Sequence, residues 1–577
     1  MKPDKTTIPI RLSSGITVNP FIKELLAGRG ISTESATRTF LEPKLKDLPD
    51  PFLMKDMNLA VRLVEECIGQ NFTILIWGDY DVDGTTATAL LIQFFQSIGY
   101  DAGYHIPNRL TDGYGIQQKG LEQISGDRDP TKTLLITVDN GISAHKAIEY
   151  AKEQGYKVIV TDHHVPPTVP VDADAIINPS QQECNFPDKT LAGVGVAFYL
   201  SVAIRVHLQK TGYFNNNREL PNMKTLLDLV AIGTVADMVP LRETNRILVR
   251  AGMEVLAKNG NIGLTALCKK TNIDSRNVRS EDISFQLAPK INAAGRLGDA
   301  SMAVKLFLAK ESKLAATIAA ELVKNNERRK SINIQNFSDA KDELSRSTDV
   351  KKYAIVVSGD YHIGVAGIVA SNLVEKYKKP SVVLCLGDDG LLKGSGRSVV
   401  GVDLHRALEK CSSLLLGFGG HKMAGGMSLL PEKLVEFQSL FDKEIMEQIQ
   451  LNGIVEESLV DTEIQIKDLF HGDILRQLQL LEPFGTENPQ PIFRDTVSSF
   501  MELAPLGKDK AHLRCSFEGN RGKQIKGVGF GIGHLIANCK SNAKREILYT
   551  PTLNNFRGRR NWQVRVTDIV FTSDNIL

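Results

Sequence analysis

The sequence has few of the features that mark secreted, membrane-spanning or disulfide-stabilised proteins. Only seven of its 577 residues are cysteine, they are scattered, and none forms a Cys-x-x-Cys pair. This pattern argues against a disulfide framework and a thiolate zinc site, and it suits a reducing cytoplasm. No stretch approaches 18 uncharged apolar residues, and no apolar region follows the first residues. We therefore expect a cytoplasmic protein with no membrane association.

An excess of one charge is also missing, because 69 Lys and Arg are offset by 67 Asp and Glu. The net charge of +2 therefore indicates no class of partner. The distribution along the chain is uneven, however. Residues 501–577 hold 13 Lys and Arg against 6 Asp and Glu, whereas residues 451–500 hold 3 against 9. A basic C-terminal end is typical of a protein that binds a polyanion.

The chain is too long for one hydrophobic core, and a prior of about 150 residues per domain predicts three or four domains. Residues 1–55 are punctuated by proline and predict an N-terminal appendage. Residues 56–335 alternate strand and helix patterns and then become largely helical, ending in a long run without Pro or Gly. A second α/β pattern spans 336–455, and short β-rich runs fill 456–577. The predicted fold is two α/β lobes, the first with a parallel sheet, joined by a long helix and followed by an all-β barrel domain.

The rest of the chain is organised around one acidic stretch. An apolar run at residues 74–77 predicts a buried strand, and it is followed by Asp79, Asp81 and Asp83. A helix is predicted to begin at Thr85, whose hydroxyl can cap it. Three carboxylates this close repel one another unless a cation binds, and oxygen ligands favour a hard divalent ion.

The spacing of these acids also matches the first half of an EF-hand calcium loop. That loop needs a Glu at its twelfth position, which here is Leu90, and a helix rather than a strand before it. The EF-hand interpretation therefore fails. A solvated acidic turn at the sheet edge remains an alternative when the stretch is considered by itself.

The next β-rich runs also end in polar residues. One runs into Asp139, and another runs into Asp162, His163 and His164. Each could be an ordinary turn, and a single His is most often a core residue. Carboxylates from three strands at the same edge of one parallel sheet instead indicate a shared metal site.

A fourth acidic position, Asp237, follows an apolar helix pattern that begins at Leu226. A lone carboxylate among apolar neighbours is costly to bury, so we expect a cation or another partner for it. A helix cap or a salt bridge is the competing interpretation.

The second α/β lobe carries three Gly-rich stretches, which begin at Ser358, Lys393 and Gly419. Glycines let backbone amides approach a phosphate, and Arg397 can hold a phosphate with two donors. Ordinary glycine turns are the competing interpretation.

Near the C-terminus, residues 555–565 interleave aromatic and basic side chains. Bases can stack on Phe556 or Trp562 while arginines contact phosphates, as in OB-folds that hold single strands. A solvated basic hairpin with Trp562 in the core is the alternative.

Four motifs in this order resemble those of the DHH phosphoesterase superfamily: Asp79-Tyr80-Asp81-Val82-Asp83-Gly84, Val138-Asp139-Asn140-Gly141-Ile142, Asp162-His163-His164 and Gly233-Thr234-Val235-Ala236-Asp237. Within that superfamily the chain resembles the single-stranded-DNA-specific 5′→3′ exonucleases, which combine DHH, DHHA1 and OB-fold domains. The resemblance extends from about Val61 to the C-terminus and includes Ile106-Pro107-Asn108-Arg109, Ile291–Arg296 and Gly417–His421. This many motifs in register are highly specific.

The resemblance assigns roles to residues of this sequence. It implies that two divalent ions, Mn²⁺ or Mg²⁺, are ligated by five residues: Asp81, Asp83, Asp139, His163 and Asp237. It implies catalytic residues that hold ligands or orient water and substrate: Asp79, Asp162 and His164. The residues implied to contact the substrate are Arg109, Arg296, His362, Ser395, Arg397, His421, Phe556 and Trp562. Two ions about 3.5–4 Å apart can clamp a scissile phosphate and turn a bridging water into hydroxide.

The resemblance implies a metal-dependent exonuclease that hydrolyses single-stranded DNA from the 5′ end to 5′ mononucleotides in DNA repair and recombination. It also implies single-stranded DNA and repair proteins, such as a helicase or a single-strand-binding protein, as partners. Two rivals remain to be weighed. A phosphoesterase for very short oligonucleotides or small phosphorylated nucleotides would not need the basic C-terminal domain. A catalytically inactive scaffold should have lost metal ligands, and every ligand position is filled.

Overall fold

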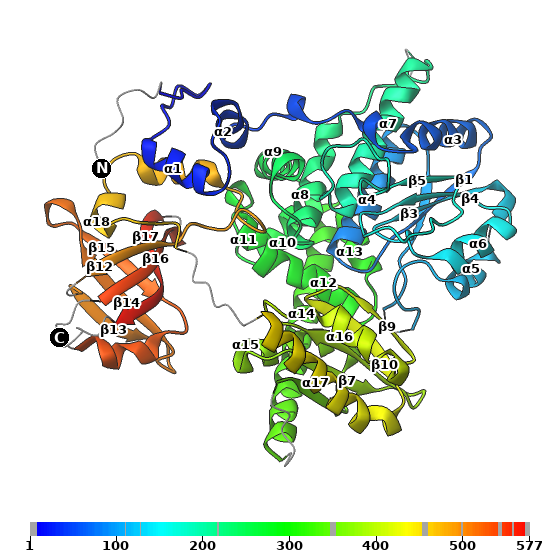
Figure 1. Ribbon diagram of the computed structural model, residues 1–577. Helices are drawn as coiled ribbons and strands as arrows, with labels where there is room; N and C mark the ends of the chain where they lie inside the picture. The colour runs from blue at the N-terminus through cyan, green and yellow to red at the C-terminus, as the bar shows by residue number, and fades with distance from the viewer. Residues whose placement is uncertain are drawn as a thin grey trace. The chain divides into compact units, whose positions relative to one another are not determined.

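The computed structural model describes residues 9–109, 111–126, 128–215, 218–346, 353–452, 460–497, 500–540, 545–556 and 559–571 (Figure 1). The chain divides into two compact units. The larger unit comprises Pro49–Asp237 and Ala251–Glu456, and the smaller unit comprises Met1–Leu48, Met238–Arg250 and Glu457–Leu577. None of the described helices is long and apolar enough to span a bilayer.

The first lobe of the larger unit contains a five-stranded parallel sheet in the order β2-β1-β3-β4-β5. Its strands are β1 Thr73–Trp77, β2 Ala102–His105, β3 Thr133–Val138, β4 Lys157–Thr161 and β5 Ala175–Ile177. Every residue of β3 is buried, and β1 and β4 are buried at every position but the first. Continuous apolar runs of this kind are needed where helices cover both faces of a parallel sheet.

Helices surround this sheet. Those after β1, β2 and β3 are α4 Val82–Ser97, α5 Gln118–Ser125 and α6 His145–Glu153. A largely helical region includes α3 Met57–Gly69, α7 Gly193–Lys210, α8 Leu227–Ala236, α9 Glu243–Asn259, α10 Ile262–Lys270, α12 Ala288–Leu297 and α13 Ser301–Leu308. Helix α4 is buried on nearly all sides because it packs against α7, α8 and α13 as well as the sheet. It therefore fixes the helical region to the strand ends.

The predicted long helix is α14, which runs unbroken from Ser312 to Arg346 (Figure 1). The second lobe follows it, with a sheet in the order β6-β7-β8-β10-β9. Its strands are β6 Ile355–Gly359, β7 Ser381–Leu386, β8 Leu392–Arg397, β9 Gly417–Gly420 and β10 Ala424–Leu429, and its helices are α15 Ala366–Tyr377, α16 Leu404–Lys410 and α17 Leu434–Asn452.

Alternation along β7 builds a core on each face of the second sheet. Val382 and Leu384 join the apolar cluster formed with α16 and α17, whereas Val383 and Cys385 join the cluster formed with α14 and α15. Successive side chains of a strand point to opposite faces, so one apolar strand serves both cores. This explains why β7 reads as an uninterrupted apolar run.

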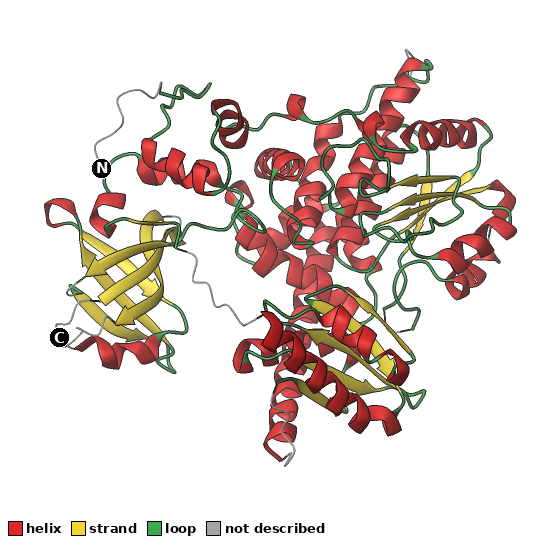
Figure 2. Cartoon of the chain, viewed as in Figure 1, coloured by secondary structure: helices red, strands yellow, loops and turns green. Residues whose placement is uncertain are grey.

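The smaller unit contains a seven-stranded sheet in the order β11-β12-β16-β17-β15-β14-β13. Its strands are β11 Thr462–Glu463, β12 Phe493–Val497, β13 Glu502–Leu506, β14 His512–Glu518, β15 Gln524–Gly529, β16 Arg545–Phe556 and β17 Arg559–Phe571. Strands β12 and β13 are consecutive in the chain but lie near opposite ends of this sheet, where β12 pairs with β16 and β13 pairs with β14. The sheet therefore curls into a barrel of the OB type (Figure 2). The predicted fold class is confirmed.

The N-terminal segment shares a core with the barrel. Helices α1 Pro20–Gly28 and α2 Glu34–Leu41 bury Ile22, Leu26 and Leu41 in the same apolar cluster as Leu481 and Tyr549. The predicted domain boundaries at residues 55, 335 and 455 stay a prediction.

A buried arginine joins three segments of the smaller unit. The guanidinium of Arg246, in the part of α9 that belongs to this unit, donates to the carbonyl oxygens of Phe40 at 2.8 Å and Leu481 at 3.0 Å. It also donates to the carbonyl oxygens of Leu480 at 2.9 Å and Glu482 at 2.8 Å. Four carbonyl acceptors take the place of the carboxylate that usually accompanies a buried cation.

Candidate metal centre and phosphate pocket

Three of the predicted acids lie at the junction of β1 and α4. The helix begins at Val82, three residues before the predicted Thr85, because Asp81 rather than the threonine caps it. The Asp81 Oδ1 accepts the Gly84 N–H at 3.0 Å, and Asp83 stands in the first turn. Both positions place negative charge at the positive end of the helix dipole. The prediction of Thr85 as the cap is wrong because a carboxylate was available earlier.

Backbone amides from α7 hold the Asp83 carboxylate. Its two oxygens accept the N–H groups of Gly193 at 2.6 Å and Val194 at 2.9 Å. A Cβ at Gly193 would lie 2.9 Å from Asp83 Oδ2, and one at Gly233 would lie 3.0 Å from Asp83 Oδ1. Glycine at these two positions lets α7 and α8 approach the acid closely, which explains the glycine in the Gly-Thr-Val-Ala-Asp motif.

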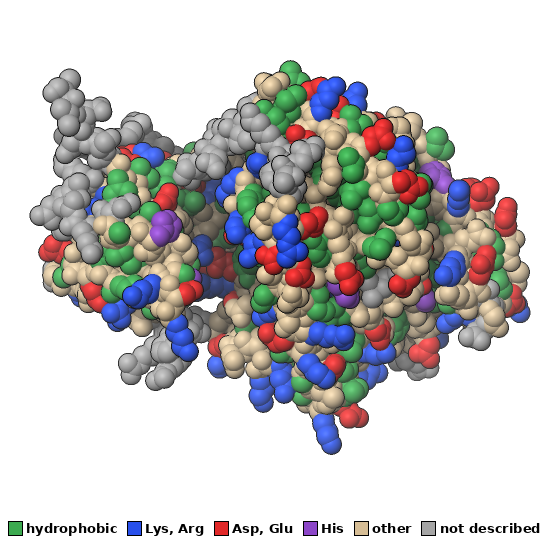
Figure 3. Space-filling view, turned by 90° about the horizontal axis from the view of Figure 1, so that it is seen from below, with side chains coloured by type: hydrophobic (Ala, Val, Ile, Leu, Met, Phe, Trp, Pro, Cys, Tyr) green, Lys and Arg blue, Asp and Glu red, His purple; other side chains and the backbone are tan. Residues whose placement is uncertain are grey.

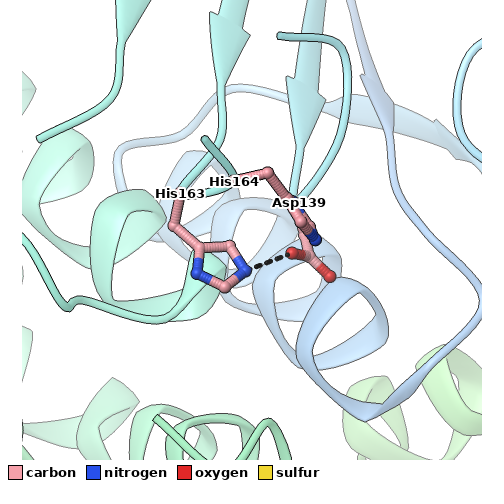
Figure 4. A group of neighbouring side chains, drawn as sticks. All are labelled: Asp139, His163 and His164. Carbon is pink, nitrogen blue, oxygen red and sulfur yellow. Dashed lines mark ion pairs between the residues drawn. The ribbon is translucent and has the colours of Figure 1, made fainter. Parts of the chain in front are cut away.

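The ends of β3, β4 and α8 bring further ligands to the same place. The His163 Nε2 lies 3.2 Å from Asp139 Oδ1, 3.6 Å from Asp237 Oδ2 and 3.9 Å from Asp83 Oδ2. Figure 4 shows the imidazole of His163 turned toward the Asp139 carboxylate. Asp237 caps the C-terminus of α8 with its backbone, which leaves its side chain directed at this group. We name Asp79, Asp81, Asp83, Asp139, His163 and Asp237 the ligand cluster.

The carboxylates of the ligand cluster are electrostatically unfavourable in the absence of a cation. Burial first, and neighbouring aspartates second, raise the pKa of Asp79, Asp83 and Asp139 well above the ordinary value. The same two causes raise the pKa of Asp237 to about 7. Repulsion of this kind is relieved by a divalent cation.

Unsatisfied atoms in the ligand cluster test whether metal ions fit. Four buried polar atoms there have no hydrogen-bond partner among the described residues: Asp79 Oδ1, Asp139 Oδ1, His163 Nε2 and Asp237 Oδ2. Ligand atoms of Asp79, Asp81 and Asp139 lie within 4.8 Å of one another, and so do those of Asp83, His163 and Asp237. A third such group, Asp139, His163 and His164, joins the first two. Buried polar atoms normally have partners, so these overlapping groups fit two adjacent divalent ions.

The two histidines differ in protonation. Burial, and then the neighbouring His164, lower the pKa of His163 to about 4, so its imidazole is neutral and has a lone pair to offer a metal. Burial lowers the pKa of His164, whereas its hydrogen-bond partner and the nearby carboxylates raise it. The hydrogen bond to Asp162 and the charge of nearby carboxylates outweigh burial and raise its pKa to about 9. In the metal-free protein, His164 is therefore a cation beside the ligand cluster at neutral pH.

Asp162 is occupied with holding this histidine pair. Its Oδ1 accepts the backbone N–H groups of His163 at 2.8 Å and His164 at 3.1 Å, and lies 2.7 Å from His164 Nδ1. Its Oδ2 accepts the Ile142 N–H at 3.0 Å. These bonds lower the pKa of Asp162 in spite of its burial. Its carboxylate orients the neighbouring histidines.

A pocket of about 230 Å³ adjoins the ligand cluster. We name it the phosphate pocket; it is lined by Asp79, Tyr80, Asp81, Arg109, Tyr114, Asn292, Gly295 and Arg296. The Arg109 guanidinium lies over the Tyr80 ring at 5.1 Å. Burial first, and the neighbouring cations Arg109, Arg329 and Arg397 second, lower the pKa of Arg296 to about 10. Clustered guanidinium groups of this kind favour an anion.

The second lobe supplies the other predicted substrate residues of the larger unit. The Arg397 guanidinium donates to Ser395 Oγ at 2.8 Å and to the Gly396 carbonyl at 2.7 Å, and burial and Arg109 lower its pKa. The His362 Nδ1 accepts the Gly364 N–H at 3.0 Å. His421 is exposed in the turn between β9 and β10, close enough to lower the pKa of His163.

The two predicted aromatic contacts belong to the smaller unit. Trp562 is partly buried and packs against the core of the barrel, as the alternative interpretation expected. The side chain of Phe556 lies outside the described residues. An aromatic residue that sequence reasoning missed is Phe530, which is 60% exposed and contacts the His512 ring edge-on at 5.5 Å.

Two polar residues near the ligand cluster were also missed. The Tyr114 hydroxyl lies 3.3 Å from the Asp139 carbonyl and 3.4 Å from His164 Nε2. The Asn140 amide donates to the carbonyls of Trp77 and Val138 and accepts the Ile116 N–H at 3.1 Å. Asn140 lies in the Val138–Ile142 motif, and that motif does not indicate these long-range contacts.

Comparison with known protein families places three domains along the chain. The DHH family N-terminal domain matches residues 73–234, the DHHA1 domain matches residues 350–447, and the RecJ OB domain matches residues 460–568. The single-stranded-DNA-specific exonuclease RecJ of Haemophilus influenzae is 34% identical over 572 residues, covering 96% of this chain and 97% of that protein. The chain belongs to the RecJ family.

Other RecJ proteins show similar coverage. The single-stranded-DNA-specific exonuclease RecJ of Escherichia coli is 35% identical over 562 residues, covering 95% of this chain and 96% of that protein. The crystal structure of RecJ from Thermus thermophilus in complex with Mn²⁺ is 27% identical, with a TM-score of 0.76, covering 98% of this chain and 79% of that one. A Mg²⁺ complex of RecJ from the same organism gives a TM-score of 0.71 at 26% identity, with 98% and 78% coverage.

Proposed function

We propose that this chain is a metal-dependent exonuclease that hydrolyses single-stranded DNA from the 5′ end and releases 5′ mononucleotides, in DNA repair and recombination. One observation carries the proposal: three overlapping groups of metal-ligand atoms adjoin an arginine-lined pocket. Membership of the RecJ family supports single-stranded DNA as the substrate. Mn²⁺ or Mg²⁺ is the metal that the oxygen-rich ligands and the metal-bound relatives support. We place this reaction in the cytoplasm.

The ligand cluster divides naturally between two ions. Asp79, Asp81 and Asp139 would hold one, and Asp83, His163 and Asp237 would hold the other. Asp139 and His163 also share a group, which suits residues that stand between the two positions. When bound, two such ions supply positive charge for the scissile phosphate and a water of lowered pKa.

The surrounding residues position these ligands and add charge. Asp162 contacts the two histidines through three hydrogen bonds, and His163 presents Nε2 to the carboxylates. His164, whose Nδ1 lies 2.7 Å from Asp162 Oδ1, stands beside the ligand cluster, where its other ring nitrogen can face a reacting phosphate. The Tyr114 hydroxyl, 3.4 Å from His164 Nε2, holds that ring in place.

The phosphate pocket accounts for the choice of a chain end. Arg109 and Arg296 line it, and Arg397, which donates to Ser395, lies close enough to lower the pKa of Arg296. A terminal phosphate carries about two negative charges, whereas a phosphodiester inside the strand carries one, so several arginines favour the terminal group. We propose that these residues hold the 5′ phosphate, with His362 and His421 nearby on the second lobe.

The barrel of the smaller unit is proposed to hold more distant nucleotides. In OB-folds, the face of the second and third strands and the adjoining loops bind oligonucleotides. Those strands are β14 and β15 here, and Phe530 with His512 lies at their end. The nearby Lys508, Lys510 and Lys526 are exposed. This face suits base stacking together with phosphate contacts better than the partly buried Trp562.

Two rivals are weaker. A phosphoesterase for very short oligonucleotides would gain nothing from the barrel, because a dinucleotide cannot reach a second site. A catalytically inactive scaffold would not keep a complete ligand cluster, which is unfavourable without metal. Protein partners such as a helicase or a single-strand-binding protein remain a proposal.

Digestion of end-labelled DNA tests the function. A long single strand with a 5′ label should release labelled mononucleotide at once in Mn²⁺ or Mg²⁺, whereas a 3′ label should leave last. A duplex and the Asp139→Ala variant should be inert. Cleavage limited to very short oligonucleotides would favour the small-substrate rival, and no cleavage with either metal would favour the scaffold.

A further inference from the structure

The loop after β6 touches Arg296 in two ways. The Arg296 Nη1 donates to the Gly364 carbonyl at 3.3 Å. A Cβ at Gly364 would collide with the carbonyl oxygen of Arg296, so this loop fits closely over the C-terminal end of α12. The charged groups that act most on Arg296 are the cations Arg109, Arg329 and Arg397, and no carboxylate is among them. The Gly364 carbonyl is therefore the contact that sets the direction of this guanidinium.

Helix α14 holds the same loop by side-chain hydrogen bonds. The Asn336 Oδ1 accepts the His362 N–H at 3.1 Å. The Glu343 carboxylate accepts the Ser358 N–H at 3.2 Å through Oε1 and the Tyr361 hydroxyl at 2.6 Å through Oε2. Asn336 is 6% exposed, so its bond is shielded from water. These three bonds fix both ends of the loop to one helix.

The spacing on α14 explains why one helix can do this. Asn336 and Glu343 are seven residues apart, which places them on one face about 10.5 Å apart along the axis. On the same stretch of the helix, Phe337, Ala340 and Leu344 pack into the core of the second lobe. Helix α14 also packs on α12, the helix that carries Arg296. Arg296 is therefore linked to α14 both directly through α12 and through the loop.

We propose that Asn336 and Glu343 are positioning residues that hold the Ser358–Gly364 loop against Arg296 and so set the geometry in which the 5′ phosphate is bound. This inference rests on the proposed function, because it assumes that Arg296 contacts the terminal phosphate. The two residues touch neither phosphate nor metal. They act through the Gly364 carbonyl, and losing one of them frees Arg296 to adopt other directions.

Steady-state kinetics on two strands test this role. The strands have the same sequence and carry a 5′ phosphate or a 5′ hydroxyl. The Asn336→Ala variant should raise KM for the phosphorylated strand about three- to tenfold, the value of one hydrogen bond, with little change in kcat. KM for the hydroxyl strand should change less, because it has no terminal phosphate for Arg296 to hold. Asn336→Asp keeps an acceptor for the His362 N–H and should restore most of the affinity.

Matched controls separate positioning from general damage. Gln335→Ala removes an exposed neighbour on the same helix and should leave both KM values unchanged. In a double-mutant cycle, Asn336→Ala should add little to the effect of Arg296→Ala, because both act on the same contact. Equal rises in KM for both strands, or full additivity with Arg296→Ala, would overturn the proposal.

The test also distinguishes this inference from the proposed function. If the wild-type chain digests neither strand with Mn²⁺ or Mg²⁺, the proposed function fails. Affinity for the phosphorylated strand, measured by fluorescence anisotropy in EDTA, then still reports whether Asn336 and Glu343 support Arg296. In that assay Glu343→Gln and Asn336→Ala should each weaken binding, and no weakening would refute the positioning role.

Discussion

Single side chains of the ligand cluster show a conflict between stability and function. Burial and mutual repulsion raise the pKa values of its aspartates, which means that each ionised carboxylate destabilises the metal-free fold. For Asp237 the folded pKa of about 7 lies above the ordinary value of 3.8. The stability contributed by such a group is fully present below pH 3.8 and is lost as the pH rises through 7. The metal-free protein should therefore be weakest at alkaline pH.

Metal binding should accordingly stabilise the protein more at high pH. We expect the rise in melting temperature between EDTA and saturating Mg²⁺ to be larger at pH 8 than at pH 5.5, because the ligands must lose protons to bind the ion. Differential scanning fluorimetry at both pH values measures this. An equal rise at the two values would show that the ligand cluster does not take up the metal as described.

Removing one charge should separate activity from stability. Asp139→Asn should lower the rate of strand digestion by more than about 100-fold, the upper range for residues that only support a ligand. Its melting temperature in EDTA should nevertheless be equal to or higher than that of the wild type, since repulsion is relieved. Asp172→Asn, at an exposed position, should change neither quantity. A large fall in melting temperature in EDTA would assign Asp139 a structural role instead.

At the scale of elements, the contacts of Arg246 join α9 to the N-terminal and C-terminal segments of the smaller unit. Burial first, and the neighbouring Arg250 and Arg29 second, lower the pKa of Arg246 to about 9. Its charged form is therefore less favourable than that of an exposed arginine. Its four carbonyl acceptors come from two distant stretches of the sequence. The Arg246 side chain thus satisfies backbone carbonyls that strand pairing or a helix would otherwise satisfy.

Replacing this arginine should destabilise the smaller unit. Arg246→Leu leaves four buried carbonyls without their donor and should cost on the order of 3–5 kcal/mol of unfolding free energy. Arg246→Lys should recover only part of this, because an ammonium has three donors in a different geometry. Urea denaturation followed by far-UV circular dichroism measures the loss of unfolding free energy. Glu254→Ala, at an exposed site of α9, is the control. A loss below 1 kcal/mol would contradict the role of this arginine.

At the scale of the whole molecule, the net charge of +2 gives no general attraction for DNA. On the face seen in Figure 3, Lys and Arg lie among Asp and Glu. On the proposed function, we expect attraction of DNA to depend on two local sites, the phosphate pocket and the end of β14 and β15. We expect a long strand to use both of these proposed sites, and a very short strand to use only the first.

The barrel should consequently matter only for long strands. The double variant Phe530→Ala, His512→Ala should weaken binding of a long single strand about tenfold, since stacking contributes about 1–3 kcal/mol per base. Digestion of a trinucleotide should fall far less. The Val435→Ala variant removes a side chain that is 72% exposed in the larger unit and serves as the apolar control. Equal losses on both substrates would point to misfolding rather than to DNA contact.

Much of this protein is determined by local sequence. Apolar strands that end in Asp79, Asp139 and Asp162 place acids at one edge of a parallel sheet, because crossover connections bring the carboxyl ends of all its strands together. The long helix, the second lobe and the β-rich domain likewise follow from hydrophobic periodicity. The tertiary structure decided what periodicity does not encode. It shows that Asp81 rather than Thr85 caps α4, that Trp562 packs in the core while Phe530 is exposed, and that α14 anchors a loop against Arg296. The cap is a local contact, in which Asp81 accepts the Gly84 N–H before any threonine can. The other two depend on contacts between residues far apart in the chain, whose partners are set only by packing.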